Sequence, residues 1–186
     1  MLVSTECPGE GVEEVVEEVC SVPVGKRAIA TGPTKDTFTQ WVQPHLGPMA
    51  RLATRLADGS EPDDILQESL TRAWLRLGTY RPARGSPRVW LLAIVADQAR
   101  RSRRRQHRQA LSRPVAARST SSDDDLDLER AVRGLASRQR LAIELHYFAD
   151  LSIAESASVM GCAEGTVKST LADARARLRS LLKESS

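Results

Sequence analysis

Cysteine is scarce in this sequence, and its few copies are scattered. Cys7, Cys20 and Cys162 are isolated thiols without a paired C-x-x-C spacing, and the three histidines lie far from them along the chain. Zinc sites and disulfide frameworks both need such paired spacings. We therefore expect no metal site, and nothing in the sequence calls for a cofactor.

Long apolar runs are also missing. No apolar stretch approaches the roughly 18 residues that a membrane helix needs, and the first residues lack the basic start and apolar run of a signal peptide. The sequence has no Walker loop, no H-E-x-x-H pair and no paired Cys/His cluster. We therefore expect a cytoplasmic protein with no membrane insertion and no enzymatic activity.

Aromatic residues make up only 4% of the 186 residues, whereas alanine, arginine and leucine are abundant. This composition favours helices. The net charge of +3 hides local patches, because acidic residues collect near 6–18 and 123–129 while basic residues crowd the middle and the far end. We expect an all-α protein of two small helical domains joined by a flexible linker.

Residues 1–33 are predicted to be a flexible N-terminal extension. Within them Val12, Val15, Val16 and Val19 recur at helical spacing with glutamates between them, which indicates a short acidic amphipathic helix. An isolated valine-rich helix of this length is marginal. The segment is either a frayed, solvated stretch or a docking element for a basic or apolar surface.

Residues 34–108 are predicted to form the first domain. An apolar helical period from Phe38 to Leu56 is interrupted by prolines, which predicts two helical pieces with a bend. Pro62 opens a second helix to about Leu77, and a loop with two prolines leads to a third helix that begins after Ser86. That helix is apolar at first and then carries six arginines between residues 100 and 108.

Residues 109–125 are predicted to be the linker and 126–183 the second domain. Near its end, Ser152 and Glu155 have the spacing of a capping box, Gly161 predicts a helix end, and a further helix begins near Glu164. Two helices joined by a short glycine turn indicate either a DNA-reading helix-turn-helix or a plain helical hairpin with a charged outer face.

Four stretches together resemble the sigma-70 family, specifically its small extracytoplasmic function (group IV) sigma factors. They are DDILQESLTRAWLRL, YRPARGSPRVWLLAIVADQARRSRRR, LASRQRLAIELHYFADLSIAESASVMGCAEGTVKSTL and ARARLRSLL. They follow the order of sigma domains 2 and 4 across the linker. The resemblance implies a protein that binds core RNA polymerase, recognises the minus 35 and minus 10 elements of promoter DNA and nucleates melting, with an anti-sigma factor as a possible further partner.

The resemblance also assigns residues to surfaces. It implies contact with core polymerase by Asp64, Gln67, Glu68 and Arg72. It implies contact with the minus 10 element by two parts of the chain, the segment that captures a flipped base and the arginine run that follows. The residues of these two parts are Tyr80, Arg81, Arg84, Ser86, Arg88, Asp97, Arg100, Arg101 and Arg104. It implies contact with the minus 35 element by the last helix, through Glu164, Gly165, Thr166, Lys168, Ser169, Thr170 and Arg175.

Some positions depart from the family. Many relatives carry Asn where Asp97 stands, and arginine where Thr170 and Asp173 stand, so the promoter sequence cannot be copied from the family. Two other functions compete with a sigma factor. A dimeric operator-binding regulator would not explain the Asp64 to Arg76 helix, and a helical interaction protein that never touches DNA would leave the arginines without a role.

Overall fold

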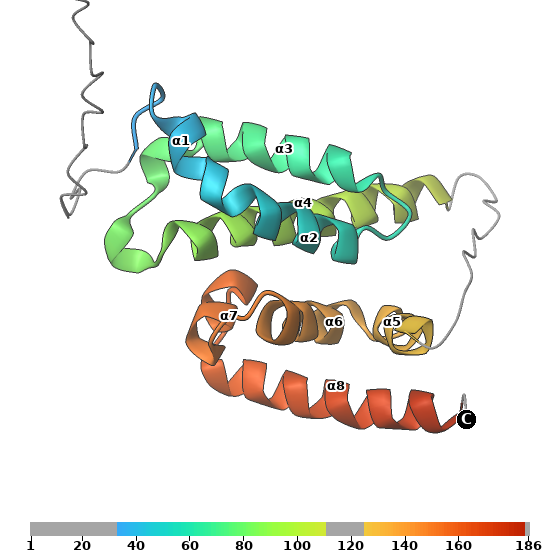
Figure 1. Cartoon of the computed structure of the whole chain (residues 1–186). Coiled ribbons are helices and arrows are strands. Elements are labelled where there is room, and N and C mark those ends of the chain that lie inside the picture. The colour runs from blue at the N-terminus through green and yellow to red at the C-terminus, as the bar shows by residue number, and fades with distance from the viewer. Residues whose placement is uncertain (1–32, 111–124, 185–186) are drawn as a thin grey trace, which may run out of the picture.

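The computed structural model describes residues 33–110 and 125–184, and all regular structure in these two ranges is helical (Figure 1). The first range holds α1 (Phe38–Val42), η1 (Gln43–His45), α2 (Leu46–Leu56), α3 (Pro62–Leu75), η2 (Leu77–Thr79), η3 (Pro82–Arg84) and α4 (Pro87–Ala110). The second holds α5 (Asp125–Arg133), α6 (Ser137–Ile143), η4 (Glu144–Phe148), α7 (Ile153–Met160) and α8 (Glu164–Glu184). The expected all-α fold is confirmed.

Helices α2, α3 and α4 pack against one another around the apolar first half of α4. Leu91, Leu92 and Val95 are completely buried there, as the unbroken apolar run predicted. The proline-rich stretch breaks the first helical period into α1, η1 and α2, because Pro44 lies in the tight turn η1. Helix α3 begins at Pro62 as predicted and ends at Leu75, two residues earlier than predicted.

The second group of helices places α8 along α5, α6 and α7. The predicted capping box is confirmed, since Ser152 Oγ accepts from the Glu155 amide at 3.2 Å and Glu155 Oε2 accepts from the Ser152 amide at 2.9 Å. Gly161 ends α7 in the left-handed conformation at φ +63°. Val167 and Ala174 are fully buried, so the apolar stripe of α8 holds this helix in a fixed orientation.

The two helical groups pack directly on each other, with α7 against α4 (Figure 1). Their buried side chains form one continuous apolar cluster. The predicted linker began at residue 109 and ended at 125, but α4 continues to Ala110 and α5 already begins at Asp125. The predictions for the N-terminal extension up to residue 32 and for residues 111–124 lie outside the described residues.

None of the described helices has the length and apolar character required to cross a bilayer. Among the residues in the two described ranges, no three His, Cys, Asp or Glu side chains are grouped so that they could hold a metal ion.

Candidate polymerase and nucleic-acid interfaces

The outward face of α3 presents a row of side chains at helical spacing. Asp64, Gln67, Thr71 and Leu75 are all exposed along it, because residues three and four apart share one side of a helix. Glu68 lies beside this row, half-buried, and forms a 3.5 Å ion pair with Arg72 one turn later. The four residues assigned to core polymerase are therefore brought together on one helix.

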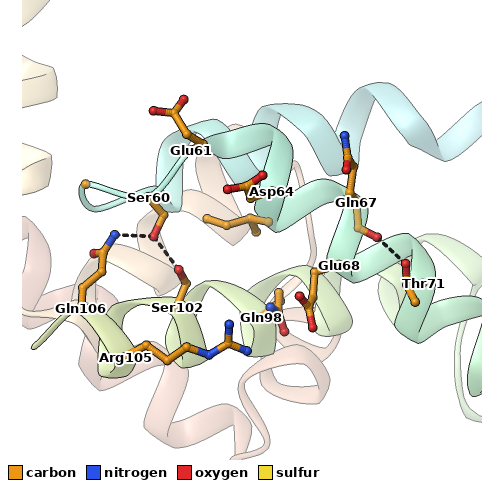
Figure 2. Close-up of a pocket in the computed structure, with 12 residues that line it drawn as sticks. Ser60, Glu61, Asp64, Gln67, Glu68, Thr71, Gln98, Ser102, Arg105 and Gln106 are labelled. Atoms are coloured by element: carbon orange, nitrogen blue, oxygen red, sulfur yellow. Dashed lines mark hydrogen bonds between the residues drawn. The ribbon is translucent and has the colours of Figure 1, made fainter. Parts of the chain in front are cut away.

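This face borders a polar cleft of about 690 Å³ between α3 and α4 (Figure 2). Glu61, Asp64 and Glu68 line it from the α3 side, whereas Arg105 reaches in from α4. At one end Gln106 donates to the Ser60 hydroxyl at 2.8 Å, and Ser60 is hydrogen-bonded to Ser102, so the turn before α3 is fastened to α4. The α3 wall is thus a fixed acidic surface that suits a basic protein partner.

Two large apolar side chains at the end of α3 are exposed, and the sequence patterns did not predict this exposure. Leu75 is 75% exposed and Trp74 is 37% exposed. The ring of Trp74 still packs edge-on against Phe38 at 5.3 Å between ring centroids, whereas Leu75 stands clear of the core and continues the row that starts at Asp64. Its position eleven residues after Asp64, three helical turns, was the signal that could have revealed it.

The second half of α4 carries a basic groove. Its lining consists of Asp97, Arg100, Arg101, Arg104, Arg105 and Arg108, around a volume of about 470 Å³. Asp97 is the acidic member and pairs with Arg101 at 2.8 Å and with Arg100 at 3.7 Å. The predicted arginines therefore do share one side of the helix, and Asp97 partly neutralises the first two of them.

The loop before α4 places the Tyr80 ring inside the core, and its predicted contact with the minus 10 element stays a prediction. Its side chain is only 7% exposed, and its ring lies 5.3 Å from that of Trp41 and 5.5 Å from that of Trp90, between ring centroids. Burial raises the pKa of the Tyr80 hydroxyl, which is oriented toward the Gly85 carbonyl at 3.3 Å. Tyr80 therefore fixes the loop from inside the core and presents no free face for stacking on a base.

The other loop residues keep their side chains outside. Arg81, Arg84 and Ser86 are exposed, and Arg81 donates to the Gly78 carbonyl at 2.6 Å, which orders its guanidinium. Arg88 behaves differently, since it donates to the Ala149 carbonyl of the second helical group. The loop thus presents two exposed arginines, while Arg88 in the first turn of α4 is engaged between the two groups.

Helix α8 exposes most of the residues predicted to reach the minus 35 element. Glu164, Gly165, Thr166, Lys168, Ser169 and Arg175 all face outward. Thr170 does not: it is 9% exposed, and its hydroxyl donates to the Thr166 carbonyl one turn earlier at 2.7 Å. The Thr170 hydroxyl is thus engaged within the helix, and its predicted contact with the minus 35 element stays a prediction.

Both halves of the chain match families of known proteins. Residues 41–109 match the model of Sigma-70 region 2, and residues 125–178 match that of Sigma-70, region 4. The ECF RNA polymerase sigma factor SigM of Mycobacterium tuberculosis is 35% identical over 72% of this chain and 69% of its own length. SigL of the same species is 32% identical over 75% of this chain and 85% of its own length.

A solved structure shares the arrangement of helices. The sigma factor RpoE of Bartonella quintana, in complex with the anti-sigma factor NepR, gives a TM-score of 0.68 at 27% identity, over 81% of this chain and 98% of the RpoE chain. The two sigma regions, the relatives at more than 30% identity and the shared fold agree with one another. The chain therefore belongs to the sigma-70 family, as an extracytoplasmic function RNA polymerase sigma factor that recognises promoters.

Proposed function

We propose that this sigma factor binds its partners through three surfaces. The outward face of α3, from Asp64 to Arg72 and on to Leu75, binds core RNA polymerase. The loop before α4 and the arginine groove on α4 bind the minus 10 element, and the first turns of α8 read the minus 35 element. The opposite charge of two neighbouring surfaces carries this proposal, because the acidic face of α3 repels DNA phosphates and the arginine groove on α4 attracts them. Arg105 lies at the border between the two surfaces.

The residues divide by role within the DNA-binding surfaces. Arg81, Arg84, Ser86 and Arg88 contact the melted segment, and Arg100, Arg101 and Arg104 contact phosphates. On α8 the side chains nearest the base edges are Glu164, Thr166, Lys168 and Ser169, while Arg175 contacts phosphate. Tyr80, Asp97 and Thr170 position or neutralise these groups. None of these roles is catalytic, so the chain acts as a binding subunit of the polymerase.

Two further parts of the proposal follow from the family. We place the protein in the cytoplasm, where bacterial RNA polymerase meets the chromosome. We also propose an anti-sigma partner, on the precedent of the Bartonella quintana factor bound to NepR.

Run-off transcription with purified core polymerase tests the proposed function. Promoters are first identified by genome-wide mapping of the DNA bound by the chain, and each is then transcribed with and without the chain. We expect transcripts only when both core polymerase and the chain are present. Operator binding by the chain alone, with no stimulation of transcription and no capture of core polymerase, would instead support a dimeric regulator.

Replacing Leu75 with serine is expected to weaken core polymerase binding about tenfold while leaving the fold intact. The side chain is 75% exposed, so its loss costs the isolated chain little, whereas an apolar side chain buried in an interface contributes on the order of 1.5 kcal/mol. Affinity for core polymerase and thermal unfolding of the free chain are the two measurements. A lowered midpoint of unfolding with unchanged affinity would show that Leu75 is structural.

Replacing Gly165 with alanine is expected to stabilise α8 and yet weaken binding to the minus 35 element. A methyl group at this position meets nothing within 4 Å, and alanine in a helix is favoured over glycine by up to about 1 kcal/mol. The same methyl group occupies space between the helix and DNA. Thermal unfolding and binding to the mapped promoter measure the two effects, and unchanged promoter affinity would mean that this backbone stays away from the DNA.

A further inference from the structure

Asp173 is an exposed acidic side chain in the middle of α8. Among the described residues its carboxylate has no ion pair and no hydrogen bond, although Arg177 follows one turn later. Arg175, on another side of the helix, donates instead to the Leu171 carbonyl one turn earlier at 3.2 Å. The Asp173 carboxylate is therefore available to a partner outside the chain.

The rotation of α8 is fixed by its buried stripe. Val167 and Ala174 are completely buried, and Leu171 is 3% exposed. Seven residues complete nearly two turns of a helix, so Thr166 and Asp173 lie on one line along the same flank of that stripe. The two residues are about 10 Å apart along the helix axis, which is the length of about three base steps. Asp173 therefore extends the row of base-facing side chains that the proposed function places at the start of α8.

Small side chains lie beside Asp173 on the outward side of α8. Ala172 and Ala176 are exposed. Ser169, one turn earlier, is exposed as well, and its hydroxyl donates to the Thr166 carbonyl at 3.0 Å, which keeps it close to the helix. None of these three side chains extends far, so the helix backbone can approach the floor of a major groove. Such an approach brings a side chain as short as aspartate within reach of base edges.

We propose that Asp173 is a specificity-determining residue that selects cytosine in the minus 35 element. This inference rests on the proposed function, in which α8 reads that element. A carboxylate can only accept hydrogen bonds. In the major groove cytosine presents the N4 amine, a donor, whereas guanine presents two acceptors and thymine presents an acceptor beside its methyl group. Adenine presents a donor next to an acceptor, so only cytosine offers the carboxylate a donor alone.

The wrong base costs more opposite an anion than opposite a neutral side chain. The phosphates of both strands repel the Asp173 carboxylate, and only a donor on the base compensates for this repulsion and for the lost hydration. Opposite guanine the carboxylate faces the N7 and O6 acceptors and stays unpaired. Asp173 therefore lowers the affinity for most sequences, and this repulsion is what makes the choice of base selective.

Selection from a promoter library tests this proposal. The full chain and core RNA polymerase are bound to copies of a mapped promoter in which the minus 35 element is randomised, and the bound DNA is sequenced. We expect one position at which cytosine is favoured over guanine about fivefold. The variant Asp173→Ala is expected to abolish that preference and to bind the other sequences more tightly. Asp173→Asn is expected to move the preference from cytosine to adenine, because an asparagine amide pairs with adenine N6 and N7.

Arg177→Ala is the matched control, because this exposed side chain lies on the same flank one turn later. It is expected to weaken binding and to leave the cytosine preference unchanged. Thermal unfolding of each variant checks the fold, which should be unaffected because both side chains are exposed. A minus 35 element without a cytosine preference, or a preference that survives in Asp173→Ala, would overturn this inference alone. A wild-type chain that enriches no minus 35 sequence would overturn the proposed role of α8 and the inference with it.

Discussion

Replacing Gln67 and Glu68 together with alanine is expected to lower the affinity for core RNA polymerase about a hundredfold. Both side chains line the polar cleft between α3 and α4 shown in Figure 2. A central interface side chain commonly contributes a kcal/mol or more, and about 2.8 kcal/mol for the pair corresponds to the hundredfold loss. Equilibrium binding of the labelled chain to purified core polymerase measures it directly.

The control for this double variant lies on the other domain. Lys168→Ala removes an exposed cation from α8 and is expected to weaken minus 35 recognition while core binding stays unchanged. Thermal unfolding should move little in either case, because Gln67 is exposed and Glu68 loses only a 3.5 Å pair with Arg72. Equal loss of core binding in both variants would refute the division between a polymerase face on α3 and a promoter face on α8.

The α3 surface could be predicted because its signal is local. Asp64, Gln67 and Glu68 share a helix whose period and proline start are both readable from the sequence, and the capping box at Ser152 is equally local. The exposed arginines of α4 follow from the same period. In each case the residues that act together lie within a few helical turns, so their relative placement needs no tertiary information.

The position of Tyr80 could not be predicted in this way. A loop tyrosine beside arginines has the composition of a base-stacking site. The Tyr80 ring is nevertheless buried in the core, where it packs against Trp41 of α1 and Trp90 of α4. With so few aromatic residues in the chain, those of the first domain gather in one cluster. Tertiary packing thus decided between two uses that the local sequence allowed equally.

The ion pairs between the two helical groups could not be predicted from sequence patterns, for a different reason. Arg55 and Glu144 are 89 positions apart, and Asp58 and Arg140 are 82 apart. A helix with surface arginines and aspartates gives no sign of which charge will be buried by another domain. Thr170 is a smaller example, because threonine on a recognition helix can face DNA or bond its own backbone, and only the rotation of α8 shows that it does the latter.

Replacing Arg100, Arg101 and Arg104 together with glutamine is expected to make DNA binding by the full chain much weaker and less sensitive to salt. Each phosphate neutralised on duplex DNA adds about 0.9 to the slope of log affinity against log salt, so three lost contacts lower the slope by up to about 2.7. Anisotropy of a labelled mixed-sequence duplex over a salt series measures this slope. The free chain suffices, because the side chains of Arg100 and Arg101 are 48% and 46% exposed even with the two helical groups packed together.

The variant Asp97→Asn is expected to change DNA affinity in the opposite direction. Asp97 pairs with Arg101 at 2.8 Å and with Arg100 at 3.7 Å, so part of their charge is compensated before DNA arrives. Removing the carboxylate frees both arginines for phosphate, and we expect severalfold tighter binding with a steeper salt slope. Arg133→Gln on α5, an exposed arginine outside the groove, should leave the slope unchanged. If Asp97→Asn weakened binding, the carboxylate would be orienting the arginines toward DNA, and its ion pairs would be part of the contact surface.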